Sequence, residues 1–368
     1  MSATPPPLIA PVPVAVAPKR RRGPWPAIAL VLLCLLLVSS YNNLKHMFGG
    51  GSGHSSLPSR AGIPRLEESV IEDNDSTNKI AVIEVDGIIT SEFERGGATM
   101  VELIQDQFKV AARDRRVKAV ILKVNSPGGE VLASDDINRA IEKFQQDSGK
   151  PVIASMGSLA ASGGYYVSAP CRWIVANELT ITGSIGVIMS TYNYRGLMDK
   201  IGLRPEVYKS GKFKDMLSGS KREEEITQEE KQMVQDLINE TFERFKTVVA
   251  DGRSLANRKN KDSSDSKGQT LSSKWKDYAD GRVLSGKEAY NLGFVDELGG
   301  WETAVKRAEK LAHIDKATLV QYQQIFDITS LFRLFGKSDS KGVKVDLGFD
   351  LPKLRQGCLY FLSPTYVH

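Results

Sequence analysis

The hydrophobic pattern changes character several times along the chain, and the first change lies near the N-terminus. Residues 24–41 are almost continuously apolar and are about the minimum length that spans a bilayer as a helix. The basic cluster Lys19–Arg22 precedes this run, and no basic residue follows it immediately. This asymmetry predicts a disordered cytoplasmic tail at residues 1–23, a single transmembrane anchor at 24–41 and the remaining chain outside the membrane. A cleaved signal peptide is the alternative interpretation, which the weak cleavage site disfavours.

Residues 42–78 are Gly/Ser-rich and then acidic without periodicity, which predicts a flexible linker. From Lys79 onward, short β-branched runs alternate with segments of helical spacing. The runs predict strands at 80–85, 117–124, 151–154 and 172–176, and the helical segments are 99–113, 134–144 (capped by Ser134) and 164–169. This alternation over more than a hundred residues predicts an α/β fold with βα units around a largely parallel sheet.

The second half of the globular region is more polar. Arg204–Tyr208 predicts a short strand, and Thr227 caps a long helix that is expected to reach Arg253. The polar run 259–273 predicts an exposed loop, and the last clear helix is 301–312. The sequence therefore predicts one domain at 79–315, followed by a tail at 316–368 to which no role is assigned.

Three Gly-rich turns follow apolar strands: NSPGG at 125–129, AASGG at 160–164 and TGSIG at 182–186. Each alone is typical of a tight turn, but turns at strand ends are also where α/β proteins assemble their sites. Ser162 has only Ala and Gly as neighbours, so its hydroxyl is unshielded, and the following amide of Gly163 can face a developing oxyanion. The plainer alternative is a serine that caps a helix.

Composition restricts the chemistry available to such a serine. The chain has four histidines, none of which is placed for a Ser-His-Asp triad or paired at metal-ligand spacing: His46, His54, His313 and His368. Cys34, Cys171 and Cys358 are too scattered for a zinc site or a disulfide framework. The net charge of +5 owes much to the N-terminal cluster and does not indicate nucleic-acid binding. A nucleophilic Ser162 would therefore need a lysine as its base.

Together with SGKFKD at 210–215, the three turns resemble one family in content and in order. This family is the signal peptide peptidases of the SppA (protease IV) type, membrane-anchored serine peptidases on a ClpP/crotonase-like fold of repeated β-β-α units. The resemblance covers roughly residues 79–312 and, because AASGG occurs once, matches the short form with one catalytic unit per chain.

The resemblance implies a role for each matching residue: Ser162 as nucleophile, Lys214 as general base, Ser184 as the group that orients the lysine amine, and the amides of Gly129 and Gly163 as the oxyanion hole. From the residues alone, Lys209, Lys212 and Lys221 are rivals of Lys214, and Ser158 is a rival of Ser162.

A lysine base must act in its neutral form. At a pKa of ~10.4, only about one lysine in a few thousand is neutral at pH 7, so we expect Lys214 to be buried in a largely apolar wall.

The expected protein is thus a membrane-bound serine endopeptidase that degrades cleaved signal peptides and other membrane-associated peptides. The resemblance implies that these peptides bind in an extended conformation and have small or apolar side chains. The resemblance implies no metal or cofactor, a homo-oligomer with active sites completed between subunits, and a location at the cell membrane of a bacterium. A catalytically silent scaffold on the same fold is the first alternative, although it would usually lose Ser162 or Lys214. An acyl-CoA enzyme of the crotonase type is the second, which the external topology and SGKFKD disfavour.

Overall fold

The computed structural model describes residues 66–92, 98–261, 267–324 and 359–362. The predicted anchor at 24–41 and the tail that precedes it lie outside these ranges. Within them, no helix combines the length and the apolar character that crossing a membrane requires.

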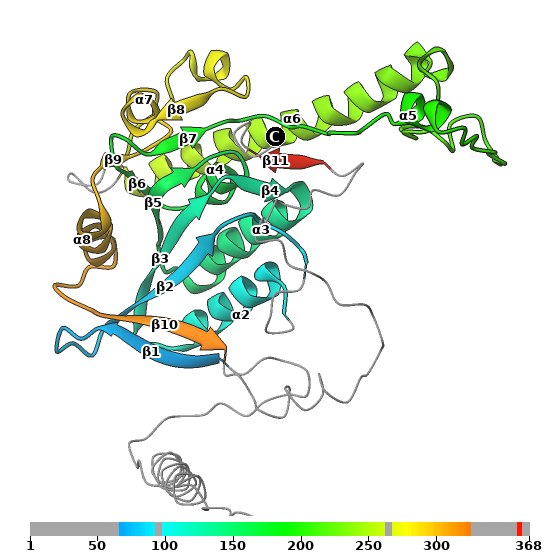
Figure 1. Ribbon diagram of the computed structural model, residues 1–368. Helices are drawn as coiled ribbons and strands as arrows, with labels where there is room; N and C mark the ends of the chain where they lie inside the picture. Colours follow the sequence, from blue (N-terminus) through cyan, green and yellow to red (C-terminus); the bar gives the residue numbers. More distant parts are fainter. Residues whose placement is uncertain (1–65, 93–97, 262–266, 325–358, 363–368) are drawn as a thin grey trace, which may run out of the picture. The chain divides into compact units, whose positions relative to one another are not determined.

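A nine-stranded, largely parallel sheet forms the centre of the described chain (Figure 1). Its main path is β1 (Leu66–Glu72), β10 (Thr318–Gln324), β2 (Lys79–Asp86), β3 (Val117–Ser126), β5 (Val152–Ala160), β6 (Trp173–Ala176) and β9 (Glu297–Leu298). Only β1 runs antiparallel along this path. β7 (Ile181–Gly183) pairs with β5 and with β8 (Val283–Ser285). The prediction of an α/β fold with a largely parallel sheet is confirmed.

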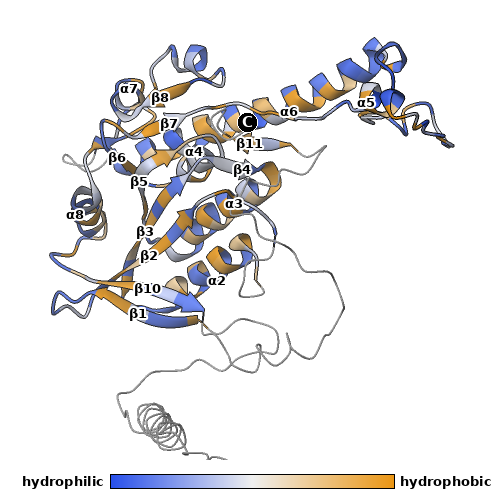
Figure 2. Cartoon of the chain, in the orientation of Figure 1, coloured by the Kyte–Doolittle hydropathy of each residue, from blue (hydrophilic) through white to orange (hydrophobic). Residues whose placement is uncertain are grey.

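Helices cover both faces of the sheet. α2 (Met100–Arg113) and α3 (Val131–Ser148) pack on one face, and α8 (Trp301–Leu311) packs on the other (Figure 1). The alternating residues of β3 divide accordingly: Val120 and Leu122 belong to the core under α2 and α3, and Ile121 belongs to the core under α8. Figure 2 shows the resulting hydrophobic colour along β2, β3 and α3. Burial on both faces explains why the sequence of β3 is an almost uninterrupted apolar run.

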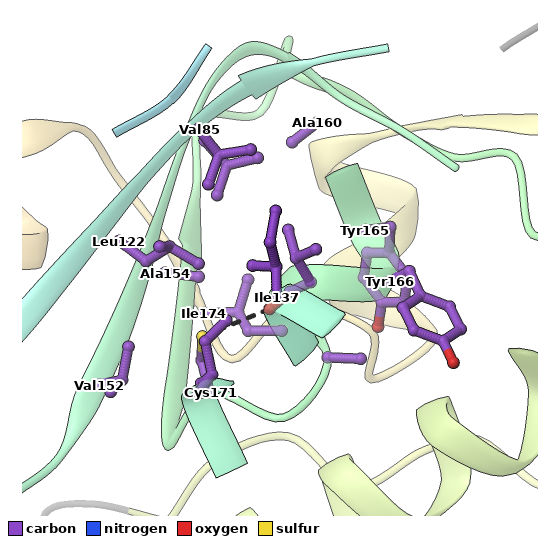
Figure 3. Close-up of a cluster of buried hydrophobic side chains, with 14 of the residues drawn as sticks. Val85, Leu122, Ile137, Val152, Ala154, Ala160, Tyr165, Tyr166, Cys171 and Ile174 are labelled. Carbon is purple, nitrogen blue, oxygen red and sulfur yellow. Dashed lines mark hydrogen bonds between the residues drawn. The ribbon is translucent and has the colours of Figure 1, made fainter. Parts of the chain in front are cut away.

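The core under α3 supports the strand ends that carry the candidate site. In Figure 3, Val85, Leu122 and Ala154 come from three neighbouring strands and lie toward Ile137 of α3. All four side chains are fully buried. The strands are therefore rigid where they reach the candidate site. The turns that follow the strands are held at the same spacing as the strands themselves.

Several predicted elements differ from those observed. Ser134 does not cap α3 but lies inside it, where its hydroxyl donates to the Glu130 carbonyl at 2.8 Å. Residues 204–208 form no strand. α6 (Gln228–Asn260) is capped by Thr227 as predicted, but it runs on to Asn260, into the segment predicted as a loop.

The sheet also includes two segments outside the predicted domain of 79–315. β1 lies in the predicted linker and β10 in the predicted tail, and the two strands pair with each other. β10 then joins β2 in parallel, so the C-terminal part of the chain adds to the sheet beside its first long strand. Edge strands such as β1 are largely exposed, which is why its sequence carries little apolar signal.

One buried ion pair ties α6 to the sheet. Arg253 of α6 donates to Asp296 at 2.6 Å, and both side chains are fully buried. Arg253 also donates to the carbonyl of Ala169, and Asp296 accepts from the amide of Ile174 in β6. This pair therefore links the long helix to the chain that follows the candidate nucleophile.

We predict that Asp296→Ala lowers the free energy of unfolding by about 3–5 kcal/mol, because the substitution leaves the Arg253 guanidinium buried without its counter-charge. The matched control is Asp280→Ala, which removes a half-exposed pair with Arg282 and should cost less than about 1 kcal/mol. Urea unfolding of the full chain measures both, and equal losses would contradict the assignment.

Candidate active site

Ser162 occupies the turn between β5 and the short helix α4 (Gly163–Ser168). Its backbone has φ 54° and ψ −115°, a combination that L residues rarely adopt and that costs about 1–3 kcal/mol. The side chain is 1% exposed, and its Oγ makes no hydrogen bond to any described residue. A serine held on a strained turn from strand to helix, with its hydroxyl uncommitted, has the placement of a nucleophile.

The three Gly-rich turns come together around Ser162. Its amide donates to the Gly183 carbonyl at 2.9 Å, which joins AASGG to TGSIG. The amide of Ala161 donates to the Ser126 carbonyl at 3.1 Å, which joins AASGG to NSPGG. Turns that are separated in the sequence therefore form one site at the ends of β3, β5 and β7.

Glycine is required where the first two turns meet. A Cβ on Gly163 would lie 3.0 Å from the Cα of Gly128 and 3.1 Å from the nitrogen of Gly129. A Cβ on Gly129 would lie 1.9 Å from the carbonyl oxygen of Ile89. These backbones can approach each other only because no side chain separates them.

The amides of Gly129 and Gly163 both lie where the first two turns meet. Ile89 bonds to the residues on either side of Gly129, namely to Gly128 and Glu130 of β4 (Gly128–Glu130), so the Gly129 amide faces the opposite edge of the strand, where β11 (Tyr360–Leu362) pairs with β4 and Phe361 lies opposite Gly129. Gly163 is the first residue of α4, where an amide has no intrahelical acceptor. Two donors at such positions can stabilise an oxyanion.

Ser184 lies on the third turn, immediately beyond the Gly183 carbonyl that holds Ser162. It has φ 49°, is 3% exposed, and donates its amide to the Arg282 carbonyl at 2.7 Å. It also lines a cavity of about 390 Å³, whose other walls include Ile188 and Phe242 of α6. The structure thus places Ser184 beside the candidate nucleophile and on a cavity.

Lys214 does not lie with these residues. It belongs to a turn within residues 189–240, here called the arm, which comprises α5 (Arg195–Lys200), the following loops and the N-terminal part of α6. Figure 1 shows α5 near the N-terminal end of α6, whereas α4 lies beside the C-terminal half of that helix. Lys214 is exposed, contrary to the burial expected of it. A single chain therefore does not bring the predicted nucleophile and base together.

The rival lysines are engaged in ion pairs. Lys209 donates to Asp215 at 2.8 Å and holds the pKa of that carboxyl below its usual value. Lys221 donates to Glu230 at 2.6 Å, which raises the pKa of the lysine. Lys212 pairs with Glu229. Across the described chain Lys214 makes no ion pair, so it is the one lysine of this turn whose amine is not tied to a carboxylate.

The rival serine is also placed differently. Ser158 lies inside β5 and is exposed, with Gly157 before it and no Gly-Gly after it. It therefore lacks both the turn and the neighbouring amides that surround Ser162.

Sequence reasoning did not identify Tyr165 and Tyr166 of α4 as part of this region (Figure 3). The Tyr165 hydroxyl donates to the Phe294 carbonyl at 2.9 Å, and the Tyr166 hydroxyl donates to Asp135 at 2.6 Å. Burial and the Asp135 carboxylate raise the pKa of Tyr166, which keeps this hydroxyl a donor. The two tyrosines anchor the helix that follows Ser162. The only available signal was a pair of large residues directly after a run of small ones.

Comparison with known proteins identifies the family. The model of peptidase family S49 matches residues 144–315. A protein of Enterococcus faecium named as a signal peptide peptidase SppA is 34% identical over 71% of this chain and 72% of its own length. A protein of Synechocystis sp. named as a protease is 35% identical over 78% of this chain and 93% of its own. Protease 4 of Haemophilus influenzae is 36% identical over 66% of this chain and 36% of its own.

The chain therefore belongs to peptidase family S49, the serine peptidases that include SppA and protease 4. Among solved structures, a membrane-bound stomatin-specific protease matches 64% of this chain and 86% of its own at 13% identity and a TM-score of 0.37, a likeness too distant to inform the site.

We predict that Gly128→Ala destabilises the protein more than Gly149→Ala. Both glycines have positive φ, of 103° and 70°, so both substitutions incur the ~1–2 kcal/mol of a left-handed L residue. Only at Gly128 would the Cβ also meet other backbone atoms, at 1.9 Å and 2.6 Å, which should add about 1–3 kcal/mol. Urea unfolding compares the two variants, and similar losses would mean that this junction can relax.

Proposed function

We propose that this chain is a membrane-anchored serine endopeptidase of the short SppA form, on a ClpP/crotonase-like fold, in which Ser162 is the nucleophile and Lys214 is the general base. The observation that carries the proposal is the strained, buried Ser162 with its uncommitted hydroxyl at the junction that holds the amides of Gly129 and Gly163. Family membership supports a serine peptidase, and the pairing of the rival lysines supports Lys214.

The reaction is acyl transfer to water. The neutral amine of Lys214 accepts the Ser162 proton as Oγ attacks the peptide carbonyl carbon, and the oxyanion accepts hydrogen bonds from the Gly129 and Gly163 amides. The C–N bond then breaks, and Lys214 returns the proton to the leaving amine. Water attacks the acyl-serine with Lys214 again as base, which releases the new carboxylate. Ser184 orients the lysine amine during both steps.

Lys214 reaches Ser162, in this proposal, from a neighbouring copy of the chain. The arm has almost no core of its own, because Glu230 is the only buried residue between positions 186 and 244. It also carries ten of the eighteen large hydrophobic residues that are exposed in the described chain: Tyr192, Tyr194, Leu197, Ile201, Leu203, Val207, Tyr208, Leu217, Met233 and Leu237. An apolar surface of this kind is typical of a protein–protein interface.

The geometry favours a head-to-tail assembly. The arm and the Ser162 turn are different surfaces of the same chain, so a contact between them joins unlike patches and can close into a ring. Such packing would cover Lys214 with apolar side chains and provide the environment that a neutral amine requires. This homo-oligomer, its anchor at 24–41 and a peptidase domain on the outer side of the membrane are parts of the same proposal.

The proposed substrates are cleaved signal peptides and other membrane-associated peptides. The name of the Enterococcus relative supports this class, and the cavity beside Ser184 offers apolar walls at Val187, Ile188 and Phe242 to such peptides. No cofactor is part of the proposed reaction.

We predict that Ser162→Ala and Lys214→Ala each reduce hydrolysis of a fluorogenic peptide by at least about 1,000-fold, because each removes one half of the nucleophile–base pair. The assay uses the full chain in detergent, with Ser158→Ala and Lys212→Ala as matched controls that should retain activity. An active Lys214→Ala chain would move the base to another lysine, and an inactive but folded wild type would favour the silent scaffold.

Mixing the two inactive variants tests the shared site. If one copy supplies Ser162 and another supplies Lys214, co-assembled Ser162→Ala and Lys214→Ala chains should recover a substantial fraction of wild-type activity. A site completed within one chain gives no recovery, because every chain then lacks one of the two groups. Subunit exchange is verified by differently tagged chains, so that a failure to recover activity is interpretable.

We predict that the double substitution Leu197→Glu/Ile201→Glu dissociates the oligomer and reduces peptidase activity at least about 10-fold, since it places two charges on the apolar arm. Light scattering coupled to gel filtration measures the assembly. Leu179→Glu is the matched control, because Leu179 is 85% exposed but lies outside the arm. An assembly that survives the double substitution would locate the interface elsewhere.

A further inference from the structure

We propose that Asp215 is a positioning residue for the reaction: together with Lys209, it closes the turn that presents the amine of Lys214. The inference rests on the proposed function, because it takes Lys214 as the general base. It adds the interaction that holds this base in place, in a part of the chain that has almost no apolar core.

One ion pair joins the two ends of the turn from Lys209 to Asp215. The Lys209 amine donates to both carboxylate oxygens of Asp215, at 2.8 Å and 2.9 Å. The same amine donates to the carbonyl of Lys212 at 3.1 Å, inside the turn. These contacts use the three donors of a lysine ammonium. Lys209 is therefore fully committed to the turn, and Lys214 lies within the segment that the ion pair closes.

Backbone hydrogen bonds curve the chain around Lys214. The Lys214 amide donates to the Gly211 carbonyl at 3.2 Å, and the Met216 amide donates to the Phe213 carbonyl at 3.0 Å. Bonds between residues three apart define the local shape of a turn, but they do not attach it to the rest of the arm. Side chains must supply that attachment.

Asp215 also connects the turn to the helix that carries the arm. Lys221 lies 3.4 Å from Asp215 and donates to Glu230 of α6 at 2.6 Å. Among the described residues of the arm, Glu230 is the one that is buried, and it completes the capping box with Thr227 that begins α6. A chain of ion pairs therefore runs from Lys209 through Asp215 and Lys221 to the start of the helix.

This network becomes more buried toward the helix. The exposed fraction of the side chain falls from 36% at Lys209 to 14% at Asp215, 11% at Lys221 and 5% at Glu230. Solvent screens partly buried charges less than exposed ones, so these pairs constrain the geometry more than ordinary surface pairs do. In an arm without an apolar core, the network takes the place of side-chain packing beneath the turn.

The position of Asp215 makes it effective in orienting the base. It directly follows Lys214 in the chain, so a shift of its backbone moves the lysine with it. A displacement of about 1 Å at a reacting group can cost about 100-fold in rate. The network holds the turn in shape before two copies of the chain meet, and the base then reaches Ser162 of the neighbour from a preformed turn. Loss of the network should therefore lower kcat and leave substrate binding unchanged.

The first test is the steady-state kinetics of Asp215→Asn, measured on the full chain in detergent with the fluorogenic peptide. We expect kcat to fall about 100-fold while KM stays within about 2-fold and light scattering reports the wild-type mass. Asp199→Asn is the matched control, because Asp199 is also a paired carboxylate of the arm but its partner, Arg195, lies with it in α5.

The outcomes separate this inference from the proposed function. An Asp215→Asn chain that keeps the wild-type kcat, or that loses activity only because it no longer assembles, overturns the positioning role while Lys214 remains the base. An Asp199→Asn chain that loses as much kcat also overturns it, since any charge of the arm would then serve. An active Lys214→Ala chain removes the proposed function itself, and this inference with it.

The second test asks whether Lys209 acts through its charge or as a base. Lys209→Met should lose kcat as Asp215→Asn does. Lys209→Arg should recover most of it, because arginine keeps the ion pair but, with a pKa above about 12, cannot serve as a base at neutral pH. The double substitution Lys209→Met/Asp215→Asn should be no worse than either single one, since both remove the same interaction. If Lys209→Arg is as inactive as Lys214→Ala, or if the two losses add, the inference is wrong.

Discussion

The site depends on backbone approaching backbone without side chains between. Gly163, Gly128 and Gly129 meet at distances that no Cβ would permit, and Ile89 closes the far side of the same strand. This contact brings two amides into one region beside Ser162, whose backbone has a conformation that L residues rarely adopt. The strain is sustained by elements that are themselves buried, since β5 enters the turn from the core and the tyrosines of α4 hold its exit. The rigid scaffold and the strained backbone of the proposed nucleophile are therefore parts of one arrangement.

The sequence predicted the turns that form the site better than it predicted the location of Lys214. Strand periodicity located β2, β3 and β6, and glycine spacing marked the three turns that converge, because each of these signals is local. Helix limits were harder: Ser134 has the chemistry of a cap but lies inside α3, where it bonds back to Glu130. β1 was not predicted because this edge strand is largely exposed and carries little apolar signal. β10 was not predicted because its buried residues stand in a short run within a mixed tail, and only its pairing with β2 identifies it as part of the sheet.

The position of Lys214 could not have been derived from spacing. A motif can single out Lys214 as the proposed base, but it does not say whether the same chain delivers that lysine to the site. The arm has so few buried residues that the surroundings of Lys214 depend on what covers the arm. The same holds for the C-terminal segment. Tyr360 and Phe361 have no periodicity that distinguishes them from a loop, and only the pairing of β11 with Gly129 shows that they lie beside the candidate site.

The length of α6 has a consequence for when and where the peptidase is active. One end of this helix is fastened to the sheet by Arg253, and the other carries the arm to the surface that a neighbour would meet. If the base is supplied across that contact, a newly made chain is inert, and hydrolysis begins only after copies of the chain meet at sufficient density. Proteins still folding nearby would then be protected from a peptidase whose proposed nucleophile is already in place.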